Sequence, residues 1–100
     1  MTPRQRTPRL SILIAEDNPI NQEVALELLS AQGARVDVAD DGEVALQRAG
    51  ETVYDLVLMD VQMPHMDGLE ATRRIRREPA LRGLPVLALT AAALDSQREL

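Results

Sequence analysis

Short blocks of apolar residues recur along the chain, separated by polar segments with helical spacing. Residues 56–59 form one such block, which runs directly into Asp60. An unbroken apolar run of this length indicates a strand that is buried on both faces. Similar runs predict strands at 10–15 and 85–89, and alternation of polar and apolar residues predicts one at 35–38. Because residues 35–38 alternate between polar and apolar, we expect this strand to have one solvent-exposed face and to lie at an edge of the sheet.

Helices are predicted between these strands. Asn18 is suited to the N-cap of a helix that begins at Pro19 and runs to about Gln32, and Gly33 is suited to end it. Further helices are predicted at residues 43–49 and 69–77 and from residue 91 onward.

The first predicted helix is amphipathic. Its polar residues Glu23, Glu27 and Ser30 are expected to face solvent. We expect its sheet-facing stripe to consist of residues at helical spacing: Ile20, Val24, Leu28 and Ala31. Leu26 and Leu29 lie off that stripe, so the apolar face is wider than contact with one sheet requires.

The regular alternation of strand and helix predicts an α/β fold. Such an order implies a parallel sheet with right-handed crossovers and helices on both faces. The chain has 100 residues, which is the size of a single domain. Residues 1–9 are polar and contain two Pro and three Arg, so we interpret them as a flexible lead-in to a domain at 10–100.

Composition excludes several classes of function. The formal net charge is −5 and Tyr54 is the only aromatic residue, which argues against direct binding of nucleic acid. There is no Cys and one His, His65, so thiolate chemistry and multi-histidine metal sites are excluded. No apolar run is long enough to span a membrane, and no signal-peptide core is visible, so we expect a cytoplasmic domain without membrane contact.

Polar side chains end three of the four predicted strands. Glu16 and Asp17 follow the first strand, Asp60 follows the third and Thr90 follows the fourth. The carboxyl ends of parallel strands meet at one edge of a sheet, where open α/β folds bind ligands. Three carboxylates at one edge require either raised pKa values or a bound cation. Oxygen ligands without Cys or His favour Mg²⁺, with Mn²⁺ as an alternative.

This arrangement favours phosphoryl chemistry. A divalent cation beside Asp60 would neutralise the charge of an incoming phosphoryl group. An oxygen of the Asp60 carboxylate would then attack phosphorus and form an aspartyl phosphate. The Thr90 hydroxyl would donate to a phosphoryl oxygen.

Three motifs resemble those of response-regulator receiver domains. Residues 12–22, Ile-Leu-Ile-Ala-Glu-Asp-Asn-Pro-Ile-Asn-Gln, are similar to the family's acidic-pair segment, in the form found in hybrid histidine kinases. Residues 56–64, followed by Met-Asp-Gly at 66–68, resemble its phosphoacceptor strand and loop. Residues 87–91 are similar to its hydroxyl-bearing switch strand. The resemblance covers residues 10–100 and implies a flavodoxin-like, doubly wound parallel sheet of strand order 2-1-3-4.

The resemblance also implies a role for each matching residue. Asp60 would accept a phosphoryl group from a phosphohistidine of a histidine kinase or a histidine phosphotransfer domain. Asp17, Asp60 and the backbone carbonyl of Gln62 would bind Mg²⁺, and Glu16 would act through water. Thr90 and the backbone N–H of Ala91 would hold the phosphoryl group. Catalysis would be limited to self-phosphorylation and slow dephosphorylation. The domain would be cytoplasmic, either by itself or as part of a membrane-anchored hybrid kinase.

The chain departs from the family pattern at its C-terminal side. Receivers use a Lys at the end of a fifth strand, whereas this sequence has no Lys and stops before a fifth strand and helix. Two other interpretations therefore stay open: a receiver-like docking or dimerisation module without phosphotransfer, and a phosphohydrolase for small substrates. The hydrolase is less favoured, because a second acid is expected two residues after the nucleophile and Gln62 occupies that position. Without the last helix, the apolar face with Leu26 and Leu29 would be partly bare, which predicts self-association or low stability.

Overall fold

The computed structural model describes residues 9–60 and 68–88. Their elements alternate as the sequence predicts, with one 3₁₀ turn, η1, before the last strand. In chain order they are β1 (Ser11–Ala15), α1 (Pro19–Ala31), β2 (Arg35–Ala39), α2 (Gly42–Glu51), β3 (Leu56–Met59), α3 (Gly68–Arg77), η1 (Pro79–Leu81) and β4 (Val86–Ala88). Residues 1–8 of the predicted lead-in and the helix predicted from residue 91 onward lie outside the described residues, so the domain boundary stays a prediction.

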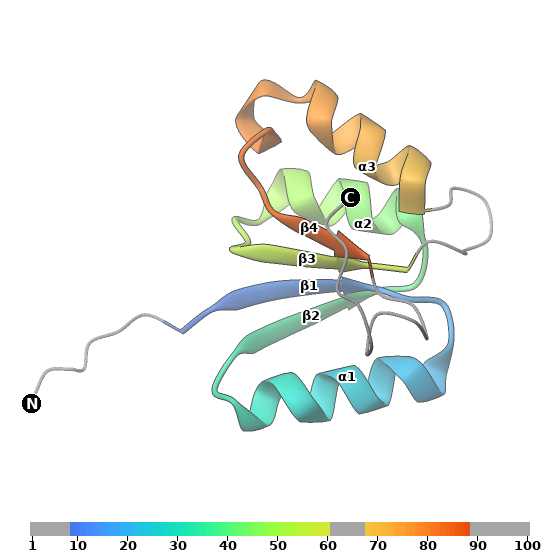
Figure 1. The fold of residues 1–100 in the computed structure, drawn as a ribbon, viewed down its shortest axis with the longest axis vertical. Helices are drawn as coiled ribbons and strands as arrows, with labels where there is room; N and C mark the ends of the chain where they lie inside the picture. Colours follow the sequence, from blue (N-terminus) through green and yellow to red (C-terminus); the bar gives the residue numbers. More distant parts are fainter. Residues whose placement is uncertain (1–8, 61–67, 89–100) are drawn as a thin grey trace, which may run out of the picture.

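The four strands form one parallel sheet in the order β2-β1-β3-β4. Helix α1 lies on one face of the sheet, and α2 and α3 lie on the other (Figure 1). This arrangement confirms the doubly wound α/β fold, and β2 occupies the edge that its alternating sequence predicts. Among the described residues, no helix is long and apolar enough to cross a membrane.

Local sequence signals fix where the first helix begins and ends and where the second helix begins. The Asn18 side chain accepts hydrogen bonds from the backbone N–H groups of Ile20 (2.8 Å) and Asn21 (3.2 Å), as an N-cap does. Asp41 caps α2 in the same way, through the N–H of Val44 at 2.8 Å. Gly33 follows α1 with φ +90°, a left-handed conformation that suits glycine.

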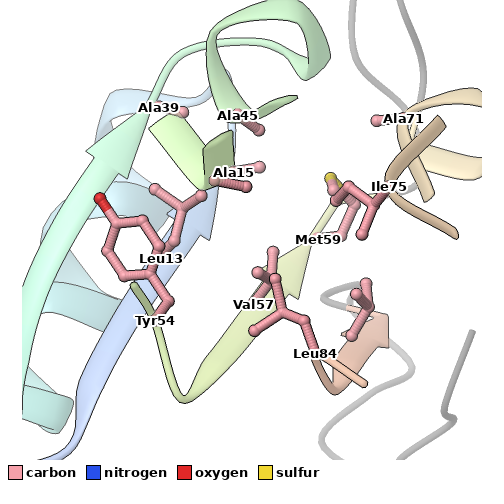
Figure 2. Packing of buried hydrophobic residues seen from close by; sticks show 12 residues of the cluster. Leu13, Ala15, Ala39, Ala45, Tyr54, Val57, Met59, Ala71, Ile75 and Leu84 are labelled. Atoms are coloured by element: carbon pink, nitrogen blue, oxygen red, sulfur yellow. The ribbon is translucent and has the colours of Figure 1, made fainter. Parts of the chain in front are cut away.

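The larger part of the core lies between the sheet and helices α2 and α3. Figure 2 shows this cluster, to which the strands contribute Leu13, Val57 and Met59 and α3 contributes Ala71 and Ile75. Tyr54 lies in the same cluster, and its hydroxyl donates to Asp37 Oδ2 at 2.7 Å. A smaller cluster on the opposite face has the buried residues Ile12, Ile14 and Ala34 at its centre.

The predicted sheet-facing stripe of α1 is wrong. Ile20, Val24 and Leu28 are 71%, 50% and 62% exposed, and Ala31 is also exposed. The helix instead packs Ala25 and Leu29 against the smaller cluster. Apolar residues surround much of α1, so several overlapping stripes fit helical spacing. Packing of α1 against the sheet selects the stripe that contains Ala25 and Leu29.

Candidate metal centre

Strand register brings the acidic residues of the β1 and β3 ends together. In the parallel pairing of β1 with β3, Ala15 lies opposite Met59, so the next residues, Glu16 and Asp60, leave the sheet side by side. The Asp60 N–H donates to the Ala15 carbonyl at 2.8 Å, which extends this pairing to the acid itself. The backbone therefore fixes where Asp60 stands relative to the β1 end.

Glu16, Asp17 and Asp60 each offer one carboxylate oxygen, and these three oxygens lie within 4.8 Å of one another. Glu16 is buried at 3% exposure, Asp60 is half-buried and Asp17 is exposed. The site therefore has one side open to solvent and one side formed by the sheet. This confirms that the acids meet at the carboxyl edge of the sheet.

Electrostatics at this edge favour a bound proton or a cation. Burial, acting with the neighbouring carboxylates of Asp60 and Asp17, raises the pKa of Glu16 from 4.5 to about 7. The backbone N–H of Asn18 donates to Glu16 Oε2 at 3.0 Å and opposes this rise. A divalent cation would remove the repulsion among the three carboxylates. Carboxylate oxygens on one open edge fit Mg²⁺, which takes few protein ligands and keeps several waters.

Gly68 supports the site from α3. A Cβ atom at this position would overlap the carbonyl oxygen of Asp60 and lie 2.8 Å from Cγ of Met59. Only glycine lets the start of α3 approach the backbone of Asp60 so closely. The sequence shows Gly68 in the phosphoacceptor loop motif, but it carries no sign of this contact.

Gln22 is a second supporting residue that the sequence did not single out. Its side-chain amide, in the first turns of α1, donates to the carbonyl oxygen of Glu16 and to Asp40 Oδ1. It therefore connects the loop that bears two of the acids to the end of β2. In the sequence, Gln22 is the last residue of the segment that resembles the family's acidic-pair motif, and nothing in that resemblance assigns it these contacts.

Several predicted site residues lie outside the described part of the chain. These are Gln62, Thr90 and Ala91. Their roles stay predictions that follow from the resemblance.

The sequence model of one protein family, the response regulator receiver domain, matches residues 12–99 of this chain. The fold and the acidic edge described above agree with that match. The chain therefore belongs to the family of response regulator receiver domains.

Individual relatives are parts of larger signalling proteins or isolated receiver domains. The chain is 44% identical over 91 residues to the sensor protein EvgS of Escherichia coli K12, covering 91% of this chain and 7% of EvgS. It therefore spans only a small fraction of that relative. The receiver domain of the sensor histidine kinase PA1611 from Pseudomonas aeruginosa is 43% identical, with a TM-score of 0.81 over 89% of this chain and 73% of that domain. A magnesium ion is coordinated in its active-site cleft.

A further similar structure contains a partner. It is the complex of the histidine phosphotransfer protein Ypd1 of Saccharomyces cerevisiae with the receiver domain of the response regulator Ssk1. The identity is 31% and the TM-score is 0.76, over 84% of this chain and 65% of the matched chain.

Proposed function

We propose that this chain is a phosphorelay receiver that accepts a phosphoryl group on Asp60 in two-component signal transduction. The observation that carries the proposal is the convergence of Glu16, Asp17 and Asp60, with their oxygens within 4.8 Å. Three carboxylates at one solvent-open edge form a site whose negative charge a bound cation balances. A cation bound there also neutralises the charge of an incoming phosphoryl group.

Asp60 is the proposed nucleophile. It follows β3, is half-buried and stands opposite the end of β1. A carboxylate oxygen of Asp60 forms the new bond to phosphorus while the phosphorus–nitrogen bond of the donor phosphohistidine breaks. The electron pair of that bond stays on the imidazole nitrogen.

Asp17 and Asp60 are the proposed direct ligands of Mg²⁺, with the Gln62 carbonyl as a third and Glu16 acting through water. When bound, Mg²⁺ neutralises the charge that accumulates on the phosphoryl oxygens. Thr90 and the N–H of Ala91 hold these oxygens, and the resemblance supports that assignment. The magnesium ion of the PA1611 receiver supports Mg²⁺ for this family. The Mn²⁺ alternative rests on donor chemistry alone.

The proposed partner is a histidine kinase or a histidine phosphotransfer domain. The complex of Ypd1 with the Ssk1 receiver supports a phosphotransfer partner, and the likeness to the sensor protein EvgS supports a place in a larger signalling protein. The alternative, a docking module without phosphotransfer, is not favoured. Such a module has no need to gather three carboxylates around a buried Glu16.

The test is Mg²⁺-dependent modification of Asp60. The protein is incubated with Mg²⁺ and acetyl phosphate and followed by intact mass, and it is treated separately with Mg²⁺ and beryllofluoride and followed by amide shifts. We expect a Mg²⁺-dependent phosphoryl adduct that Asp60→Asn removes. Asp55→Asn is the matched control, because Asp55 precedes the opposite end of β3, where its carboxylate accepts from the N–H of Ser11. The absence of any adduct and any shift in the wild type, or an adduct that survives Asp60→Asn, would overturn the proposal.

A further inference from the structure

Gln22 connects α1 to two loops at the acidic edge. Its side-chain nitrogen Nε2 lies 2.5 Å from the carbonyl oxygen of Glu16 and 2.9 Å from Oδ1 of Asp40. One amide nitrogen carries two hydrogens, so these two acceptors use both of them. The residue is half-buried, although it lies on a helix whose neighbouring positions are exposed.

With the bond from Gln22, both the N–H and the carbonyl oxygen of Glu16 are hydrogen-bonded. The Glu16 N–H donates to the carbonyl oxygen of Ala39 at 3.0 Å, and Gln22 binds the Glu16 carbonyl oxygen. Ala39 and Asp40 are consecutive, so the end of β2 restrains Glu16 directly through its N–H and indirectly through Gln22.

The Glu16 carbonyl belongs to the peptide unit that leads to Asp17. Holding this carbonyl therefore restricts the rotation that would swing the Asp17 carboxylate away from Asp60. Like charges favour such a rotation, because the carboxylates of Glu16, Asp17 and Asp60 approach within 4.8 Å. The restraint opposes this separation before any cation is present.

We propose that Gln22 is a positioning residue for the divalent-cation site, which it preorganises by fixing the Glu16–Asp17 peptide against the end of β2. The inference rests on the proposed function, because it concerns the Mg²⁺ site proposed there. Gln22 itself does not contact the cation. Hydrogen-bonding partners behind metal ligands typically contribute about 10- to 100-fold to metal affinity.

The substitution Gln22→Glu separates positioning from simple electrostatics. Glu has nearly the shape of Gln, but its ionised carboxylate cannot donate to the Glu16 carbonyl or to Asp40. An added negative charge near a cation site attracts Mg²⁺ when charge alone matters. Positioning therefore predicts weaker Mg²⁺ binding by this variant, and electrostatics predicts tighter binding.

The experiment is a calorimetric titration with MgCl₂ at pH 8, together with thermal unfolding in EDTA. We expect Gln22→Ala and Gln22→Glu to bind Mg²⁺ about 10-fold more weakly than the wild type. The matched control is Gln47→Ala. Gln47 is an exposed glutamine of α2 that donates to Glu51 at 3.3 Å. We expect the Gln47→Ala variant to bind Mg²⁺ with the affinity of the wild type.

The outcomes distinguish this inference from the proposed function. A wild type that does not bind Mg²⁺ overturns both. A wild type that binds, with Gln22 variants that bind equally well, overturns only the role of Gln22. Tighter Mg²⁺ binding by Gln22→Glu also overturns the role of Gln22, because the residue would then act through charge. Lower unfolding temperatures of the variants in EDTA with unchanged Mg²⁺ affinity overturn it as well, because Gln22 would then act only through stability.

A double-mutant cycle provides a second test that does not depend on one variant. Asp40→Ala removes one acceptor of the Gln22 amide and leaves Glu16 in place. If the two residues act together, Gln22→Ala weakens Mg²⁺ binding less in the Asp40→Ala background than in the wild type. Strictly additive effects of the two substitutions overturn the inference.

Discussion

The fold changes the protonation of Glu16. Burial raises its pKa from 4.5 to about 7, with further contributions from Asp60 and Asp17. The metal-free folded protein therefore holds this proton more tightly than the unfolded chain does. The stability that comes from protonated Glu16 is fully present below pH 4.5 and is lost as the pH rises through about 7.

Glu16→Gln should therefore stabilise the metal-free protein at pH 8 and change its stability little at pH 4.5. Between these values, wild-type stability falls relative to the variant by at most about 1.4 kcal/mol per pH unit. Denaturant unfolding in EDTA, followed by Tyr54 fluorescence, measures the difference. The control is Glu23→Gln at an exposed position of α1. A pH-independent difference between Glu16→Gln and the wild type would contradict the prediction.

Gly68→Ala should destabilise the protein and disturb the backbone of Asp60. The added methyl group meets the Asp60 carbonyl oxygen and Met59 Cγ in a filled region. Overpacking of this kind costs about 1–3 kcal/mol, and denaturant unfolding measures it. Gly50→Ala is the matched control. Nothing lies within 4 Å of a Cβ atom at Gly50, and this helical position gains about 0.5–1 kcal/mol from Ala. Equal effects of the two substitutions would show that the contact with Asp60 does not matter.

At the scale of the elements, hydrogen bonds from an arginine side chain join α3 to the segment that leads into β4. Two arginines of α3, Arg73 and Arg74, are exposed and form ion pairs with Glu70. Arg76 differs. Its Nη1 donates to the carbonyl oxygens of Arg82 at 3.1 Å and Leu84 at 2.6 Å. It thus stabilises the turn that sets the start of β4.

Arg76→Ala should lower the free energy of unfolding by about 1.5–3 kcal/mol, because hydrogen bonds from a charged donor are lost. Arg77→Ala, at the exposed neighbouring position, should change stability by less than about 0.5 kcal/mol. Denaturant unfolding compares the two variants at equal net charge. A similar loss in both would mean that charge, and not the link to β4, accounts for the effect.

At the scale of the whole molecule, the described residues cover the two faces of the sheet unequally. On one face α2 and α3 cover the larger core, and on the other α1 covers a smaller cluster (Figure 1). On α1, Ile20, Val24 and Leu28 remain exposed. Exposed apolar side chains at helical spacing form a surface that favours association.

We therefore expect the protein to self-associate as its concentration rises, as the sequence predicts from its wide apolar face. Leu28→Glu should shift the protein toward the monomer, because it places a charge within the exposed stripe. Sedimentation velocity over a range of concentrations measures the change. Ser30→Glu adds the same charge at an exposed polar position of α1 and should leave association unchanged. A wild type that stays monomeric at all concentrations would contradict this prediction.

The order of the elements and the identity of the acids could be predicted from the sequence. Apolar runs bounded by polar residues define the strands, and Asn18, Gly33 and the polar segments define the first helix, because these signals are local. Once the strands are parallel, Glu16 and Asp60 lie at the same edge of the sheet, and the pairing of β1 with β3 brings them together.

The tertiary structure decided which surfaces and supports these elements use. Helical spacing allowed several apolar stripes on α1, and packing against the sheet placed Ala25 and Leu29 inward. The contacts of Gln22 with Asp40 and of Gly68 with Asp60 join segments that are distant along the chain or separated by a loop. A sequence pattern records local preference, whereas such contacts depend on how whole elements are oriented in space. The sequence by itself therefore determined the acids of this site, and only the folded arrangement determined what holds them in place.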